Sequence, residues 1–257
     1  VAGLRRALSP LAPEGGLVGD GSGDGPPGAG GGGVEIVVAD DGSGDGTADA
    51  ARAAGADQVL ALPVNRGKGA AVRAGVLAAR GRTIAFTDAD LAYPPSQLLR
   101  LLAEVEAGAD MVVGSRSHVE TRTLVRARRV RELTGRLFNL LTQLILLGRY
   151  RDTQCGLKAF RSDVARALFS HATIDRFAFD VELFHLAERY RLSLVEVPVE
   201  LANTTQSSVR VAVDALRMLR DLVALRVRAG GRSYDAPAEH PVSSQPMTGT
   251  GARQAGQ

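Results

Sequence analysis

Thr83-Ile84-Ala85-Phe86-Thr87-Asp88-Ala89-Asp90 is a short apolar run that ends in two carboxylates. Side chains alternate between the two faces of a strand, so Asp88 and Asp90 are expected on the same face. Ligands of open parallel sheets bind at the carboxyl ends of the strands. Two carboxylates at such an end suit Mg²⁺ or Mn²⁺ that is held jointly with substrate phosphates. The stretch therefore predicts an α/β fold with a metal site at Asp88 and Asp90.

Short β-rich runs alternate with helical patterns along the chain, which is typical of a mostly parallel sheet flanked by helices. We expect strands at 34–39, 58–61, 83–87, 110–114 and 194–200. We expect helices at 47–54, 68–79, 95–107, 132–147, 162–169, 180–190 and 209–228. The last helix is amphipathic and rich in Arg, a pattern that fits either packing on its own domain or lying on an anionic membrane.

The composition is that of an ordinary globular protein, with 45% hydrophobic and 23% charged residues and a net charge of +3. Few aromatic residues and no Trp leave few stacking platforms, which argues against nucleic acid as a partner. We expect one domain over 1–230. Residues 13–33 and 231–257 are dominated by Gly, Pro and small polar residues, which predicts a flexible insertion and a disordered tail.

A second acidic strand end lies upstream, where Asp40 and Asp41 precede the glycine-rich turn 42–46. Carboxylates at this edge of a sheet can accept hydrogen bonds from a base or a ribose. A calcium loop counted from Asp41 would place Arg52 where a bidentate Glu is needed. The glycines also lack the spacing of the dinucleotide fingerprint. A solvated turn remains the alternative to a nucleotide site.

Two cations follow at positions where anions bind. Lys68 opens a helix directly after Asn65-Arg66-Gly67, and Arg116 follows the strand expected at 110–114. Backbone N–H groups and cations at a helix N-terminus form a ready anion site, although a plain basic loop is the alternative. The single cysteine, Cys155, has no neighbouring base in the sequence, so we expect a buried, inert thiol.

Taken in order, these motifs resemble those of family 2 glycosyltransferases of the GT-A type, whose sheet is Rossmann-like. The motifs are Asp40-Asp41-Gly42-Ser43, Asn65-Arg66-Gly67-Lys68-Gly69, Thr87-Asp88-Ala89-Asp90 and Gly114-Ser115-Arg116. Later segments are similar to the dolichyl- or polyprenyl-phosphate glycosyltransferases, above all to the dolichyl-phosphate beta-glucosyltransferase-like branch. These segments are Asp152-Thr153-Gln154-Cys155-Gly156-Leu157-Lys158, Phe179-Asp180-Val181-Glu182-Leu183 and Val195-Glu196-Val197-Pro198-Val199.

The resemblance implies an inverting transferase that moves a hexose from a nucleotide sugar, with a UDP-glucose-type donor favoured, to polyprenyl or dolichyl phosphate. It implies Mg²⁺ or Mn²⁺ as the cofactor, and a peripheral position on the cytoplasmic face of the membrane. By position, Asp40 and Asp41 would contact the nucleoside, and Asp88 and Asp90 would hold the metal. Lys68, Arg116 and Arg131 would meet donor or acceptor phosphates, and Gln154 and Lys158 would lie on the acceptor side.

Two alternatives stay open. A family 2 transferase that acts on a saccharide hydroxyl would use Asp180 as a general base, whereas a lipid phosphate is already an anion and needs none. The other alternative concerns Val1-Ala2-Gly3-Leu4-Arg5, which looks helical where the family has a first strand that ends in a Pro-x-Tyr-Asn-Glu-like segment. A missing strand would predict an N-terminally truncated, inactive protein that only binds nucleotide or membrane.

Overall fold

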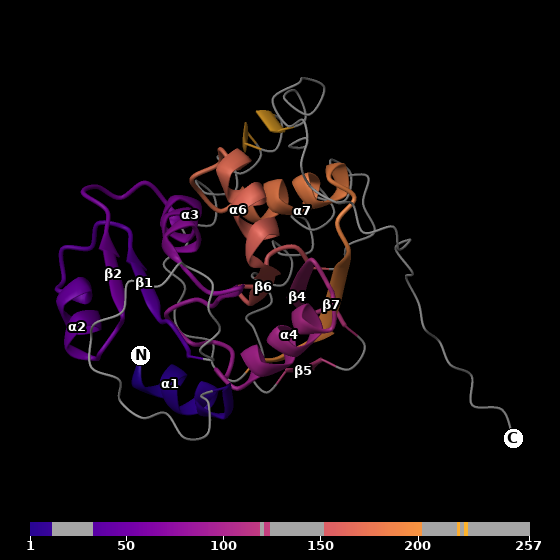
Figure 1. Cartoon of the computed structure of the whole chain (residues 1–257). Helices are drawn as coiled ribbons and strands as arrows, with labels where there is room; N and C mark the ends of the chain where they lie inside the picture. The colour runs from indigo at the N-terminus through magenta and orange to yellow at the C-terminus, as the bar shows by residue number, and fades with distance from the viewer. Residues whose placement is uncertain (12–32, 119–120, 124–151, 202–219, 222–223, 226–257) are drawn as a thin grey trace, which may run out of the picture.

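The computed structural model describes residues 1–11, 33–118, 121–123, 152–201, 220–221 and 224–225 (Figure 1). Several expected segments lie outside the described residues. They are nearly all of the insertion at 13–33, the helix at 132–147, most of the helix at 209–228, and the tail at 231–257.

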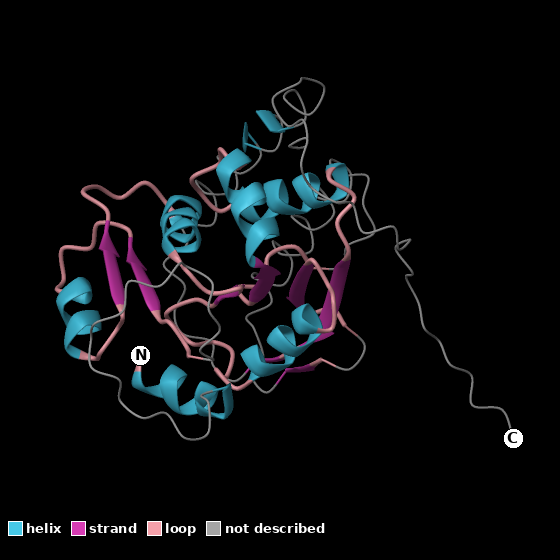
Figure 2. Ribbon diagram, in the orientation of Figure 1, coloured by secondary structure: helices cyan, strands magenta, loops and turns pink. Residues whose placement is uncertain are grey.

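Strands and helices alternate along most of the described chain (Figure 2). The strands are β1 (Val37–Asp40), β2 (Gln58–Ala61), β3 (Thr83–Phe86), β4 (Met111–Ser115), β5 (Arg122–Thr123), β6 (Lys158–Arg161), β7 (Leu194–Pro198) and β8 (Glu200–Leu201). The helices are α1 (Ala2–Leu8), the 3₁₀ turn η1 (Ser9–Leu11), α2 (Thr47–Ala53), α3 (Lys68–Ala78), α4 (Gln97–Glu106), α6 (Ser162–His171) and α7 (Phe179–Arg189). All five expected strands, and the five expected helices inside the described ranges, are confirmed with bounds that differ by a few residues.

The described strands form a four-stranded sheet in the order β3-β6-β4-β7, with two-stranded sheets β1-β2 and β5-β8. The pairs β1–β2, β4–β7 and β5–β8 are parallel. The pairs β3–β6 and β4–β6 are antiparallel. The expectation of an α/β fold with a mostly parallel sheet and flanking helices is thus confirmed, with the difference that β6 runs antiparallel to its neighbours and makes the largest sheet mixed.

The difference arises from β6, which the sequence pattern did not reveal. Its first residue is Lys158, a charged side chain that breaks the apolar run by which a central strand is usually found. In the structure that side chain is fully buried, because it has a buried carboxylate partner. β6 follows a polar segment in the sequence. It lies between β3 and β4 in the sheet, although it comes after both in the chain.

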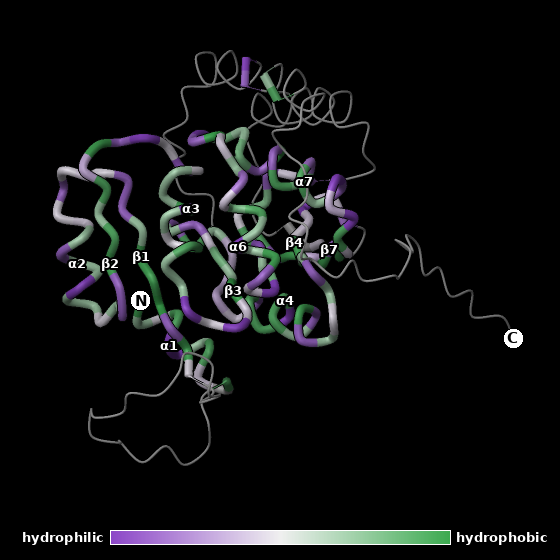
Figure 3. Tube along the Cα trace, turned by 45° about the horizontal axis from the view of Figure 1, so that its top comes forward, coloured by the Kyte–Doolittle hydropathy of each residue, from purple (hydrophilic) through white to green (hydrophobic). Residues whose placement is uncertain are grey.

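The four-stranded sheet separates two hydrophobic cores. Met111 and Val113 of β4 point into the core formed with α6 and α7, and Val112 points into the core formed with α4 and α1. In Figure 3, α4, which packs on this sheet, alternates between hydrophobic and hydrophilic residues. Both faces of the sheet are covered, so a ligand can reach the sheet only at the ends of its strands.

Helix α4 follows the signals that predicted it. It starts after Pro94-Pro95-Ser96 and ends before Gly108, whose φ of 113° lies in the region that glycine favours. Leu98, Leu101 and Val105 recur at helical spacing and are buried. This helix covers one face of the sheet by packing on β3, β6 and β4.

Candidate active site

Asp88 lies just beyond the carboxyl end of β3 and pairs with Lys68, the first residue of α3. Asp88 Oδ1 lies 2.7 Å from Lys68 Nζ, and the two side chains are 34% and 25% exposed. Burial lowers the pKa of Lys68, but the charges of Asp180 and Asp88 outweigh it and raise the pKa overall. Lys68 is therefore a cation held at the strand end where the sequence predicted a phosphate site.

Asp88 and Asp90 are not placed by strand alternation, so that part of the expectation is wrong. β3 ends at Phe86, and a turn follows in which Leu91 N donates to Asp88 O at 3.1 Å. Asp90 lies in this turn, and its Oδ1 accepts from Ala92 N at 3.0 Å. The turn, and not the alternation of side chains along a strand, determines how the two carboxylates are placed relative to each other.

Gly156 lies directly against the Asp88 carboxylate. A Cβ added at Gly156 would overlap Asp88 Oδ2. Asp88 therefore occupies the space that a side chain at position 156 would take, while its other oxygen faces Lys68. Sequence reasoning did not single out Gly156, because its role depends on β6 lying next to β3.

Asp41 holds the loop that leads into α3. Its Oδ1 accepts from Arg66 N at 2.8 Å, and its Oδ2 accepts from Gly67 N at 2.7 Å. Asp40, the last residue of β1, is buried and accepts from Ser43 N at 3.2 Å. Both predicted nucleoside contacts thus lie at the carboxyl end of β1, and Asp41 also shapes the backbone around Lys68.

The loop before α3 packs closely on the loop that precedes α7. A Cβ at Gly67 would lie 2.6 Å from Asp175 O, and one at Gly69 would lie 2.5 Å from Ile174 O. Arg66 donates to Asp175 at 2.8 Å, and Arg73 also pairs with Asp175. Asp175 was not predicted as a site residue, yet it anchors the cationic loop.

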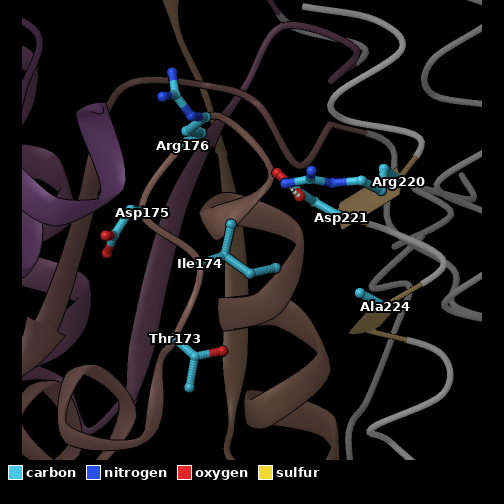
Figure 4. Close-up of a pocket in the computed structure, with 7 residues that line it drawn as sticks. All are labelled: Thr173, Ile174, Asp175, Arg176, Arg220, Asp221 and Ala224. Carbon is cyan, nitrogen blue, oxygen red and sulfur yellow. Dashed lines mark ion pairs between the residues drawn. The ribbon is translucent and has the colours of Figure 1, made fainter. Parts of the chain in front are cut away.

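A pocket lies behind this contact (Figure 4). Its lining comes from the loop before α7 and from a later segment, and consists of Thr173, Ile174, Asp175, Arg176, Arg220, Asp221 and Ala224. Arg220 and Asp221 form an ion pair at 3.5 Å on one side. The pocket shares Asp175 with the cationic loop but includes none of the residues predicted for donor or acceptor.

Lys158 and Asp180 form a buried ion pair beneath the strand ends. Lys158 Nζ donates to Asp180 Oδ1 at 2.7 Å, to Cys155 O at 2.7 Å and to Thr153 O at 3.3 Å. These three bonds match the three hydrogens of an ammonium group. Burial raises the pKa of Asp180, which the positive charges of Lys158 and Lys68 oppose. The pair is placed to fix the backbone at 153–155 and to attract Lys68.

Arg116 and Asp152 form a bidentate pair at the end of β4. Arg116 Nε and Nη2 lie 2.7 and 2.8 Å from the two carboxylate oxygens of Asp152, and Arg116 N also donates to it at 2.9 Å. The Arg116 side chain stays 43% exposed, whereas that of Asp152 is 1% exposed. Asp152 therefore holds the guanidinium in place while leaving it accessible to an anion.

The Arg116–Asp152 pair predicts a pH effect on stability. Burial raises the pKa of Asp152, but hydrogen bonds and charge from Arg116 outweigh it and hold the pKa below its usual value. The pair therefore stabilises the fold fully above about pH 4, the unfolded pKa of Asp, and loses its effect as the pH falls through the folded pKa. Urea unfolding should show Asp152→Asn less stable than the wild type at pH 7, and the difference should narrow at pH 3. If the difference in stability between the two proteins is the same at pH 3 and pH 7, the ionised Asp152 carboxylate does not stabilise the fold through Arg116.

The remaining predicted residues are placed as follows. Gln154 N donates to Asp152 Oδ1 at 3.1 Å, beside Arg116. Cys155 is buried as predicted, and burial raises the pKa of its thiol. Arg131 lies outside the residues that the structure describes.

The carboxylates of Asp88 and Asp90 suit a divalent cation only if a substrate supplies further ligands. Across the described ranges, no group of three or more His, Cys, Asp or Glu side chains is placed to hold a metal ion. Mg²⁺ and Mn²⁺ are commonly bound by one or two carboxylates together with substrate phosphates. Asp88 and Asp90 are exposed or partly exposed at the strand end, which meets that requirement.

The same ranges contain no helix with both the length and the apolar character needed to cross a bilayer.

Crystal structures of glucosyl-3-phosphoglycerate synthase from Mycobacterium tuberculosis have a similar fold. The complex with UDP superposes with a TM-score of 0.57 at 23% identity and covers 89% of this chain and 74% of that one. A complex of the same enzyme with Mn²⁺, UDP-glucose and phosphoglyceric acid gives a TM-score of 0.56. This likeness supports the GT-A fold predicted from the motifs.

Sequence relatives narrow the assignment. A dolichyl-phosphate beta-glucosyltransferase of Drosophila melanogaster is 38% identical over 206 residues, which are 76% of this chain and 63% of that protein. The human dolichyl-phosphate beta-glucosyltransferase is 33% identical and is covered over 64% of its length. The chain thus spans less than two thirds of the length of these relatives. Residues 30–169 match the family described as glycosyl transferase family 2, so the chain belongs to that family.

Proposed function

We propose that this chain carries the catalytic domain of a transferase that moves glucose from UDP-glucose to dolichyl or polyprenyl phosphate. The observation that carries the proposal is the placement of two charged groups after β3 and β4, the strands that flank β6: the Lys68–Asp88 pair after β3, and the exposed Arg116 guanidinium, held by Asp152, after β4. The relatives named above are dolichyl-phosphate beta-glucosyltransferases, and the fold relative has been crystallised with UDP-glucose and Mn²⁺.

The donor would bind at the ends of β1 and β3. Asp40 and Asp41 lie at the end of β1, on the side where the nucleoside is proposed to bind. Asp88 and Asp90 would hold Mg²⁺ or Mn²⁺, which supplies positive charge to the diphosphate when bound. Lys68 would turn from Asp88 to a phosphate oxygen, because both are anionic partners within the reach of one flexible side chain.

The acceptor would bind beside Arg116. A phosphate oxygen of the lipid attacks the anomeric carbon, the bond from that carbon to the donor diphosphate breaks, and UDP leaves. The attacking phosphate is already ionised, so no proton has to be removed, and positioning and charge stabilisation supply the catalysis. Arg116 and Arg131 are the residues proposed to meet the acceptor phosphate, with Gln154 next to them.

We propose a part for Asp180 and Lys158 that differs from the one expected. A general base must reach the proton that it abstracts. Asp180 is 2% exposed and is bonded to Lys158, which is 0% exposed. In our proposal both act as positioning residues: Asp180 attracts Lys68, and Lys158 fixes the backbone at 153–155. No observation favours transfer to a saccharide hydroxyl.

A lipid acceptor requires contact with a membrane surface, and we infer a peripheral position on the cytoplasmic face. The experiment that tests the function is transfer of radiolabelled sugar from UDP- and GDP-sugars into an organic-extractable product, with Mn²⁺ or Mg²⁺. We expect metal-dependent transfer of label from UDP-glucose. The Asp90→Ala variant should transfer label at a rate at least about 10²-fold lower. Label that does not depend on metal or on Asp90 would contradict the proposed site.

A further inference from the structure

Three buried polar side-chain atoms near Arg116 have no hydrogen-bond partner. They are Ser115 Oγ, Thr153 Oγ1 and Gln154 Nε2, and the absence holds for the part of the chain that the structure describes. The residues Ser115 and Thr153 are 0% and 3% exposed. Folded proteins rarely leave such atoms unpaired, because burial without a partner is unfavourable. Three of them around one short segment indicate that a ligand completes their hydrogen bonds.

Ser115 and Asp88 lie on two sides of the segment that leads into β6. Phe86 of β3 and Val113 of β4 both lie opposite Lys158, the first residue of β6. β4 continues beyond Val113 to Ser115, and Gly114 N donates to Leu157 O at 2.9 Å, so this end of β4 runs beside the segment before Lys158. Gly156 of the same segment contacts the Asp88 carboxylate. Ser115 and Asp88 therefore flank one short segment.

The backbone around Thr153 and Gln154 is fixed from two sides. Asp152, which is held by Arg116, accepts from Gln154 N. The carbonyls of Thr153 and Cys155 accept from Lys158. These three backbone groups are thus engaged, and the Thr153 hydroxyl and the Gln154 amide nitrogen are left for a ligand. Such rigid support is what a specific polar binding site requires.

The position of the segment identifies the ligand chemistry. It lies between Asp88, on the donor diphosphate side, and Arg116, on the acceptor phosphate side. The group that passes between these two sides is the hexose, whose hydroxyls both donate and accept hydrogen bonds. We propose that Ser115, Thr153 and Gln154 bind the hexose hydroxyls and determine which sugar is accepted, an inference that rests on the proposed function.

The test is the affinity for UDP-glucose and for UDP, measured by calorimetry with Mn²⁺ and without acceptor. Thr153→Val and Gln154→Met remove the polar atoms and keep similar volumes. Each should raise the Kd for UDP-glucose about tenfold, the effect of one or two lost hydrogen bonds, and leave the Kd for UDP unchanged. Thr153→Val should not lower the Tm of the free protein, because it replaces an unpartnered buried hydroxyl with a methyl group.

The matched control is Thr83→Val, which removes a hydroxyl at the opposite end of β3. Thr83 Oγ1 donates to Glu106 at 2.7 Å, and this variant should bind both ligands normally. The inference is overturned if the site variants bind UDP-glucose as the wild type does, or if they lose affinity for UDP equally. A lowered Tm together with lost UDP binding would assign them a structural role. A wild type that binds neither ligand would instead contradict the proposed function, and with it this inference.

Discussion

Replacing Gly156 by alanine is expected to lower glucose transfer by about 10²- to 10³-fold while the protein stays folded. The new Cβ would take the space that Asp88 Oδ2 now occupies, so the carboxylate must swing away. That movement separates Asp88 from Lys68 and misplaces the proposed metal ligand. Displacements of about 1 Å at a catalytic group can cost 10²-fold in rate. Initial rates at saturating Mn²⁺ measure the effect, and calorimetry should show weakened Mn²⁺–UDP binding.

The matched control for this change is Gly3→Ala in α1. A Cβ at Gly3 meets no atom within 4 Å, so the activity should stay at the wild-type level. Circular dichroism and the Tm of both variants check that the fold is retained. Full activity of a folded Gly156→Ala variant would contradict the role of Asp88, because that carboxylate has to move to make room.

Replacing Lys158 by methionine is expected to lower the free energy of unfolding by about 3–5 kcal/mol. The change leaves Asp180 buried without its partner, and breaking one side of a buried pair has a cost of this size. It also leaves the carbonyls of Thr153 and Cys155 without their donor. Urea unfolding at pH 7 measures the loss. The double variant Lys158→Met/Asp180→Leu should recover more than half of it, since an apolar pair of similar volume is often as stable as a buried ion pair.

The control for the buried pair is an exposed one. Arg82 and Glu106 lie 3.3 Å apart, with side chains 84% and 48% exposed. Arg82→Met should change the free energy of unfolding by less than about 1 kcal/mol, because solvent screens such pairs. Equal effects of Arg82→Met and Lys158→Met would show that the Lys158–Asp180 pair is not held away from water.

The fold was largely predictable because most of its strands are short apolar runs bounded by turns. The end of β3, the cationic start of α3 and the Arg after β4 were each found from local sequence. β6 could not be found in this way. Its buried Lys158 makes sense only with Asp180, which is distant in sequence. The mixed character of the sheet, which depends on β6, was missed for the same reason.

The candidate site shows the same limit. Asp88, Lys68 and Arg116 were found because strand ends and helix starts carry recognisable residues. Gly156 and Asp152 act through contacts across strands, so the motif that contains them did not show what each residue does. Asp180 shows a further limit of the sequence. A carboxylate in a recognisable motif was considered as a base, and the structure places it in a buried pair.

A competition between two acceptors distinguishes a phosphate acceptor from a hydroxyl acceptor. Polyprenyl phosphate and polyprenol of the same chain length would be offered together with labelled UDP-glucose and Mn²⁺, and the two products would be separated by charge. Because the exposed Arg116 guanidinium suits an anionic acceptor and Asp180 is buried against Lys158, we predict label in the phosphate-linked product alone. Label in the product from the alcohol, or transfer to neither acceptor, would contradict the proposed function.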